Sequence, residues 1–198
     1  MKDKMIKWYS DSLKKYGEKD FRSLAWGNKE GSSAKFRYKQ MFSEYDWTDK
    51  KVFEIGCGWG SFFDFRFKCK NYYGIDVIPE FIELANKNHS NDNIKFETKD
   101  IFDFTYHRKF DVAISSGVAG NRGGPAWHPC YLTEFLSKMY GAAQTVIVNF
   151  PSNRATIRTD NVEYFSPEFV LGQALNITEN IKLIHKNKFD FLLRLEHE

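Results

Sequence analysis

The sequence predicts a doubly wound α/β fold built on a mainly parallel β-sheet. From Lys51 onward, short apolar runs rich in Val, Ile and Phe alternate with helix-like segments, which is the order of consecutive βα units. A chain of 198 residues suffices for one hydrophobic core and is short for two domains of typical size. We therefore expect a single domain over residues 1–198, with an N-terminal helical cap over 1–46 and an α/β core over 47–198.

Five of the apolar runs are predicted to form the parallel strands, because each is bounded by Gly, Asp, Asn or Ser. They span residues 52–55, 72–75, 94–98, 110–115 and 145–150. A short helix is predicted over 61–68. Longer helices are predicted over 79–87 and 131–140, where apolar residues recur at helical spacing, and Pro79 suits the first helical turn.

Both ends of the chain depart from this alternation. A helix-like segment over 167–175 precedes apolar runs at 181–184 and 189–195, which a polar turn joins. These runs predict an antiparallel C-terminal hairpin that completes a seven-stranded sheet. The first 46 residues lack a strand pattern and combine aromatic residues with many charges, which predicts one or two helices and a loop packed over the sheet edge.

Composition restricts the partners and the compartment. The net charge of +3 is small and is spread along the chain, which disfavours a protein whose main task is to grip a phosphate backbone. The three cysteines show no CxxC spacing, so neither a disulfide framework nor a metal site is predicted. No run approaches the roughly 18 apolar residues of a membrane span. We expect a cytoplasmic protein with no membrane partner, and nucleic acid is a disfavoured partner.

The strongest functional signal is a glycine turn that directly follows the first strand. Gly56, Gly58 and Gly60 occupy alternate positions, and such glycines let a ligand approach the main chain closely. The third glycine comes one residue earlier than in the dinucleotide fingerprint G-x-G-x-x-G, and Glu54 precedes the turn. An acidic side chain there would repel a phosphate, so the pattern favours a cationic or zwitterionic ligand.

Three further signals follow at the ends of the next strands. Asp76 ends the second strand, where a carboxylate can accept both hydroxyls of a ribose. Asp100 ends the third strand beside Ile101, a pair suited to an adenine amino group and ring. The fourth strand opens at Ser116 into a loop rich in Gly and Pro over 117–129.

Together these four signals resemble the class I S-adenosylmethionine-dependent methyltransferase family, in order and spacing, over about residues 50–150. The resemblance implies a Rossmann-like methyltransferase fold, S-adenosylmethionine as methyl donor and S-adenosylhomocysteine as product. It also implies that the glycine turn surrounds the methionine part and that Ser116 lies beside the sulfonium. The cofactor-binding residues so implied are Arg37, Glu54, Gly56, Cys57, Gly58, Gly60, Asp76, Val77, Asp100, Ile101 and Ser116.

Two outlying segments look like those of a microbial, small-molecule-type subgroup of this family. They are residues 25–42 and 163–169. Within that subgroup an arginine, here Arg37, would meet the carboxylate of the donor. Sequence alone leaves two other readings open: Arg37 as a solvated helix residue, and Asp76 and Asp100 as helix N-caps.

The acceptor site is expected in the loop after the fourth strand. Methyl transfer from a sulfonium is an in-line displacement that depends mainly on alignment, and a general base adds roughly 10² to 10⁴ in rate where the acceptor carries a proton. His128 is the predicted base, with His107 and His185 as weaker candidates. The predicted substrate-binding residues are Trp26, Tyr106, Asn121 and Trp127.

These observations favour an enzyme that methylates an unidentified small molecule and that is a monomer or a homodimer. One alternative is a nucleic-acid or protein methyltransferase, and another is a donor-binding module without turnover. A nicotinamide-dependent oxidoreductase is opposed by the glycine spacing and by Glu54.

Overall fold

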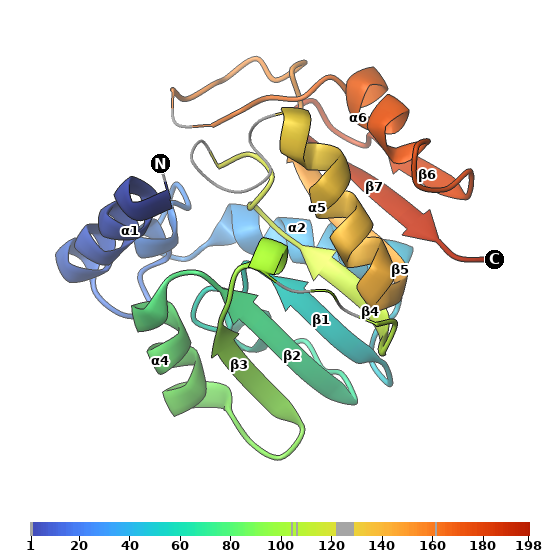
Figure 1. The fold of residues 1–198 in the computed structure, drawn as a ribbon. Coiled ribbons are helices and arrows are strands. Elements are labelled where there is room, and N and C mark those ends of the chain that lie inside the picture. The colour runs from blue at the N-terminus through green and yellow to red at the C-terminus, as the bar shows by residue number, and fades with distance from the viewer. Residues whose placement is uncertain (1, 104, 106, 122–128, 161) are drawn as a thin grey trace.

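The sheet is the scaffold on which every other element is placed. The computed structural model describes residues 2–103, 105, 107–121, 129–160 and 162–198, and within them the strands form one seven-stranded sheet in the order β3-β2-β1-β4-β5-β7-β6 (Figure 1). The strands are β1 Lys51–Ile55, β2 Asn71–Asp76, β3 Ile94–Thr98, β4 Phe110–Ser115, β5 Ala143–Pro151, β6 Ile181–Ile184 and β7 Asp190–Glu196.

Strand direction follows the predicted pattern. Each of the first five strands pairs in parallel with its neighbours among them, whereas β7 runs antiparallel to both β5 and β6. The predicted doubly wound sheet with its antiparallel C-terminal hairpin is therefore confirmed. Strand order reverses between β1 and β4, so the loops that follow these two strands leave in opposite directions and open a crevice at their carboxyl ends.

The helices connect the strands and cover both faces of the sheet. The α-helices are α1 Lys2–Tyr16, α2 Ser32–Glu44, α3 Ser61–Asp64, α4 Pro79–His89, α5 Pro129–Ala142 and α6 Pro167–Ala174. Two short 3₁₀ helices are η1 Phe21–Leu24 and η2 Ile101–Asp103. In the part of the chain that the structure describes, none of the helices combines the length and the apolar character that crossing a membrane requires.

The predicted helix over 61–68 begins where expected but is shorter than predicted. It ends at Asp64 because Arg66 adopts a left-handed conformation with φ of 65°, which interrupts helical geometry. The turn lets Phe62 and Phe67 both point inward, where each ring lies near the ring of Trp47. Burial of these aromatic rings thus outweighs continuation of the helix.

Apolar packing divides the core between the two faces of the sheet. On one face Phe135 and Leu136 of α5 pack with Val146 and Val148 of β5. On the other face α2 contributes an apolar stripe at helical spacing, Ala34, Tyr38 and Met41, of which the latter two pack against the sheet. Figure 1 shows α5 in front of the sheet and α2 behind it.

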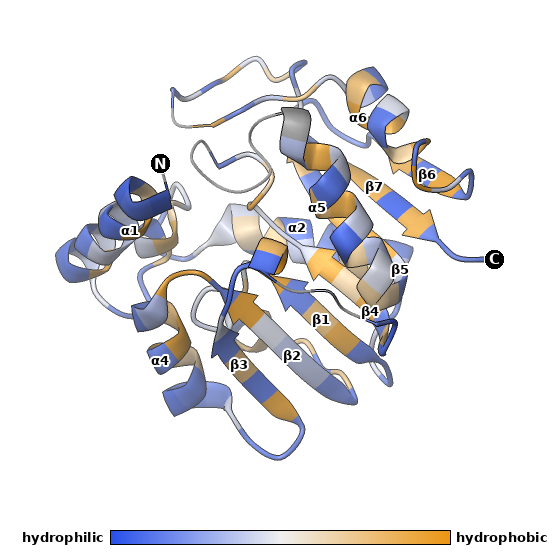
Figure 2. Cartoon of the chain, viewed as in Figure 1, coloured by the Kyte–Doolittle hydropathy of each residue, from blue (hydrophilic) through white to orange (hydrophobic). Residues whose placement is uncertain are grey.

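The helices of the first 46 residues therefore lie in two different places, and do not pack together over one edge of the sheet. The buried stripe of α2 makes it a covering helix of the sheet face. In α1 only Ser12 is buried, and Figure 2 shows that this helix is predominantly hydrophilic. The partly buried side chains of Ile6, Tyr9 and Leu13 form a narrow apolar stripe that packs on the cluster around Phe21 and Phe81, so α1 lies at the carboxyl ends of the strands, in contact with η1.

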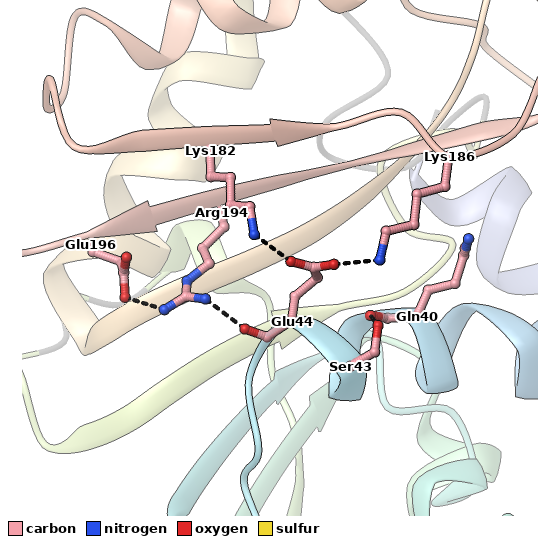
Figure 3. A network of polar contacts seen from close by, with 7 residues as sticks. All are labelled: Gln40, Ser43, Glu44, Lys182, Lys186, Arg194 and Glu196. Atoms are coloured by element: carbon pink, nitrogen blue, oxygen red, sulfur yellow. Dashed lines mark hydrogen bonds and ion pairs between the residues drawn. The ribbon is translucent and has the colours of Figure 1, made fainter.

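A polar network fastens the end of α2 to the C-terminal hairpin (Figure 3). The carboxylate of Glu44 accepts hydrogen bonds from Lys182 Nζ at 2.7 Å and Lys186 Nζ at 2.6 Å, and the Glu44 carbonyl accepts one from Arg194. Hydrogen bonds from the two lysines hold the pKa of Glu44 below its usual value. Arg194 also pairs with Glu196, so α2, β6 and β7 are joined through side chains far apart in sequence.

The buried indole of Trp47 is predicted to be a main source of stability. Its ring centroid lies 5.1 to 5.6 Å from those of Phe42, Phe62 and Phe67, and none of the Trp47 side chain is exposed. Trp47→Ala should lower the free energy of unfolding by about 3 to 5 kcal/mol, because the surrounding rings cannot close the cavity. Urea denaturation measures this loss. Trp8→Ala, at a tryptophan that is 46% exposed, is the control, and an equal loss in both variants would contradict the assignment.

Candidate functional site

A cleft of about 840 Å³ opens at the carboxyl ends of the parallel strands. Its floor is formed by the turns that follow β1, β2, β3 and β4, and its walls come from α1, η1, α2 and the segments that flank β5 and β7. The crevice expected from the reversal of strand order is therefore the site of the cleft.

The glycine turn after β1 has a backbone that only glycine adopts readily. Gly56 and Gly58 have φ values of 75° and 55°. A Cβ atom on Gly56 would lie 2.0 Å from Val118 Cγ2, so no larger residue fits there. The N–H groups of Gly56 and Cys57 both donate to the Ile75 carbonyl, which fixes the turn to the end of β2. Gly56, Cys57 and Gly58 all line the cleft.

Gly60, which was predicted to contact the donor, is not among the residues that line the cleft. It has φ of 88° and begins α3, and a Cβ atom there would lie 2.7 Å from His89 Cδ2. The structure thus corrects the expectation: the third glycine lets the chain turn beneath His89, and the first two glycines face the cleft.

Asp76 joins the glycine turn to the end of β2. Its Oδ2 accepts a hydrogen bond from the Gly58 N–H at 2.9 Å, and its Oδ1 accepts one from the Ile78 N–H at 3.0 Å. Burial raises the pKa of Asp76 to about 6, although the backbone hydrogen bonds act in the opposite direction. The N-cap of α4 is Ile78, so Asp76 is not a helix cap. A carboxylate has about four lone-pair sites, so Asp76 retains the capacity to accept a hydrogen bond from a ligand in the cleft.

Asp100 and Ile101 lie at the far end of the cleft, after β3. Asp100 Oδ1 accepts a hydrogen bond from the Phe102 N–H, which stabilises the start of η2, so the N-cap interpretation is correct for this residue. Its other oxygen pairs with Lys2 Nζ at 2.7 Å. Asp100 therefore holds η2 and the beginning of α1 while it lines the cleft.

Glu54 does not reach the cleft, contrary to prediction. Residues alternate across β1, and its side chain points to the same face as Val52, toward α2. The carboxylate is fully buried and accepts hydrogen bonds from the hydroxyls of Tyr38 and Tyr72. Burial raises the pKa of Glu54 to about 7. Tyr38 does line the cleft, and its position in the stripe of α2 gave no signal of this in the sequence.

Arg37 forms a buried ion pair in the wall of the cleft. Its Nε and Nη2 bind the two carboxylate oxygens of Asp190 at 2.9 and 3.0 Å, and its guanidinium lies 4.7 Å from the ring centroid of Trp26. Only 18% of the Arg37 side chain is exposed, so its interpretation as a solvated surface residue is wrong. Trp26, predicted to contact substrate, lines the same wall.

Two buried polar atoms at the floor of the cleft have no hydrogen-bond partner among the described residues. They are Ser116 Oγ and Asn149 Nδ2. The Oδ1 atom of Asn149 accepts a hydrogen bond from the Gly117 N–H at 2.8 Å. Ser116 is among the site residues that the sequence predicts, whereas Asn149 is not.

Helix α1 closes one side of the cleft. Asn121 Nδ2 donates a hydrogen bond to the Tyr9 hydroxyl, and both side chains line the cleft. Val77 also lines it. Asn121 was predicted to bind substrate, and the structure adds that it meets α1. Tyr9 was not predicted, because nothing in an isolated helix sequence shows which strand end it will cover.

The remaining acceptor candidates divide into two groups. Tyr106, Trp127 and His128 lie outside the described residues. His107 is exposed, and neither it nor His185 lines the cleft.

The raised pKa of Glu54 makes stability depend on pH in a predictable direction. In the unfolded chain this carboxyl ionises near pH 4.5, whereas in the fold it ionises near pH 7. Between these values the folded state binds more protons, so the free energy of unfolding should fall with rising pH, by up to about 3 kcal/mol. Glu54→Gln should make that decline smaller and should abolish it above about pH 6, below which the raised pKa of Asp76 contributes in the same direction, and urea denaturation from pH 4.5 to 8 would measure the difference. Parallel curves for the two proteins would contradict the assignment.

Comparison with known proteins agrees with this geometry. The family model described as a methyltransferase domain matches residues 48–150, just over half of the chain. No curated protein sequence matches the chain. The match covers β1 to β5 with the glycine turn, Asp76, Asp100 and Ser116.

Solved structures show a similar fold at low sequence identity. Magnesium protoporphyrin IX methyltransferase (ChlM) from Synechocystis PCC 6803 with bound SAH aligns with a TM-score of 0.69 and 12% identity, over 100% of this chain and 99% of that chain. The DhpI-SAH complex aligns with a TM-score of 0.69 and 14% identity, over 98% and 95%. A putative S-adenosylmethionine-dependent methyltransferase from Listeria monocytogenes gives 0.63 and 14%, over 84% and 100%.

The expectation of a class I S-adenosylmethionine-dependent methyltransferase, drawn from the glycine turn and the strand-end carboxylates, is confirmed by the family match and the shared fold. The chain thus belongs to the methyltransferase domain family.

Proposed function

We propose that this protein transfers a methyl group from S-adenosylmethionine to a small-molecule acceptor and releases S-adenosylhomocysteine. The observation that carries the proposal is the meeting of the glycine turn with Asp76 at the open end of the cleft. Gly56, Cys57 and Gly58 line the cleft there, and a half-buried carboxylate lies beside them. A nucleoside joined to an amino acid needs both features at this spacing.

Each part of the methyl donor is proposed to contact particular residues that line the cleft. Asp76 is proposed to accept the ribose hydroxyls, with Val77, Asp100 and Ile101 around the adenine and Gly56 to Gly58 along the methionine part. Arg37 Nη1 has no hydrogen bond to any residue that the structure describes, and it is the atom proposed for the donor carboxylate. The faces of Trp26 and Tyr38 suit a nearby positive charge.

The donor supplies an electrophilic methyl group, so the protein needs mainly to align the acceptor and to exclude water. The glycine turn, Asp76 and Arg37 are proposed to hold the donor, and Trp26 is proposed to line the acceptor side of the cleft. We propose that residues 1–46 act as a cap on the 47–198 core within one domain. Contacts of α1 with both halves of the cleft, at Asp100 and at Asn121, support this role.

Charge in the cleft favours a small acceptor. Four basic and three acidic side chains line it among the described residues, namely Lys4, Arg22, Arg37, Lys99, Asp76, Asp100 and Asp190. Such a balanced lining gives no strong electrostatic preference for a polyanion. We propose a cytoplasmic monomer or homodimer that acts on small molecules.

Two measurements would favour the alternative functions. Affinity for nucleic acid that falls steeply with salt would favour the nucleic-acid alternative, and donor binding without product across broad acceptor panels would favour a binding module.

Binding of S-adenosylhomocysteine is the direct test of the proposal. Calorimetry should show saturable, one-to-one binding that nicotinamide adenine dinucleotide does not displace, because the third glycine comes one residue earlier than in the pyrophosphate-binding fingerprint. Absence of heat with folded protein, shown by a cooperative thermal transition in the same sample, would contradict the proposed function.

The role of Asp76 gives a sharper prediction. Asp76→Asn removes an ionised acceptor of two hydroxyl hydrogen bonds and should weaken S-adenosylhomocysteine binding about 10- to 100-fold. In the wild type, affinity should also fall as pH drops through about 6, where Asp76 becomes protonated, and the variant should lack this inflection.

Asp92→Asn, at an exposed aspartate before β3, is the matched control for the loss of one negative charge. Equal affinity of both variants for S-adenosylhomocysteine would remove Asp76 from the binding site.

A further inference from the structure

Two unpaired polar side chains meet at the floor of the cleft, where β4 and β5 end. Ser115 of β4 is in register with Val148 of β5, so the next residues along each strand, Ser116 and Asn149, lie side by side. Ser116 is 6% exposed and Asn149 is 1% exposed, and both line the cleft. Both residues therefore belong to the lining of the cleft, and the protein buries nearly all of each side chain.

The orientation of the Asn149 amide is fixed by its neighbour. The Gly117 N–H can only donate, so the atom 2.8 Å away must be the amide oxygen. The Nδ2 group is therefore the part of the amide that is left without a partner among the described residues. A buried N–H donor without an acceptor is unfavourable, so a ligand atom that offers a lone pair to Asn149 Nδ2 would be stabilising.

The surroundings of this donor are largely apolar. Gly117 has φ of 85°, and a Cβ atom on it would lie 2.9 Å from the Trp26 ring, so the glycine makes room for the indole beside Asn149. Pro151, Val162 and Tyr164 continue the lining. The nearest charges in this wall, Arg37 and Asp190, neutralise each other in a two-point ion pair.

We propose that Asn149 Nδ2 and Ser116 Oγ form a subsite for the oxygen atom of the methyl acceptor, and that the acceptor is an apolar, ring-sized compound bearing a carboxylate or hydroxyl group. This inference rests on the proposed function. An oxygen offers lone pairs to the Asn149 N–H, whereas an ammonium group has only N–H donors and would face another donor. The subsite therefore selects oxygen over charged nitrogen.

The transfer that such a subsite permits is balanced without a further reactant. A lone pair of the acceptor oxygen forms the bond to the methyl carbon, and the electron pair of the breaking carbon–sulfur bond returns to sulfur. A carboxylate becomes a neutral ester with no proton to move. A hydroxyl group becomes an ether and loses its proton to water. Asn149 would stabilise the oxygen while its lone pair is aligned with the methyl group.

Three ligands that share one ring test the selection: naphthoate, naphthol and naphthylmethylamine. Each is measured by equilibrium dialysis against wild-type enzyme saturated with S-adenosylhomocysteine. Naphthoate or naphthol should bind at least about tenfold more tightly than the amine, the ratio expected from one well-formed hydrogen bond against an unpaired donor. Equal affinities, or tighter binding of the amine, would overturn the inference.

Asn149→Asp converts the donor into an acceptor and leaves an oxygen for the Gly117 N–H. It should weaken binding of the oxygen ligands about tenfold or more and should narrow or reverse the order of affinities. Ser116→Ala, which removes a hydroxyl without a partner, should weaken the binding of naphthoate and naphthol but not that of the amine. This variant tests the subsite if Asn149→Asp does not fold. Asn176→Asp adds the same charge at an exposed site and should leave the order unchanged.

Affinity for S-adenosylhomocysteine distinguishes failure of the oxygen subsite from failure of the proposed function. Wild-type affinity for it in Asn149→Asp or Ser116→Ala, together with an unchanged order of the three ligands, would reject the oxygen subsite alone. Failure of the wild type to bind it would reject the proposed function together with the subsite.

Discussion

The hydrogen bonds that fasten the glycine turn to the end of β2 are the constraint on which the site depends. The turn donates to the Ile75 carbonyl through two N–H groups and to the Asp76 carboxylate through a third. Because β1 and β2 are adjacent parallel strands, these bonds hold the turn and the carboxylate at one edge in a fixed relation. The cleft opens there because the strand order reverses on the other side of β1.

The second organising contact joins the two ends of the chain. Arg37 lies on α2 and Asp190 begins β7, and they meet in a buried pair that the Trp26 ring covers. Removing two charges from water is costly, and a two-point geometry is what makes such a pair tolerable. The pair gives the cleft a rigid wall of zero net charge. This wall is one reason why the acceptor region is described better by shape and hydrogen bonding than by electrostatic attraction.

Aromatic residues serve mainly to join the layers of the fold. The phenylalanines that follow the glycine turn pack with Trp47 and Tyr72 beneath the site, so they belong to the core. The rings that do reach the cleft, such as Trp26, Tyr9 and Tyr38, come from the N-terminal elements. The high aromatic content therefore reflects the covering of the sheet by α2 and the closing of the cleft by α1.

The sequence by itself determined the sheet, the family and most of the residues that are proposed for the donor half of the cleft. Strand patterns, the glycine turn and the carboxylates Asp76 and Asp100 are local features, and local backbone preference and strand polarity suffice to place them. What sequence could not decide was which residues of the motif reach the cleft. Alternation along β1 turns the Glu54 side chain into the interior, and Gly60 lies in the tight turn into α3, away from the cleft lining.

Only the tertiary structure decided the wall and floor of the acceptor region. Arg37 with Asp190, Tyr9 with Asn121, and Asn149 beside Ser116 each join segments that are far apart in the chain. No periodicity or spacing encodes such meetings, because they depend on how α1, α2 and the C-terminal strands pack against the sheet. The residues proposed for the methyl donor come mainly from local motifs at the strand ends, whereas those proposed for the acceptor are brought together by the packing of the fold.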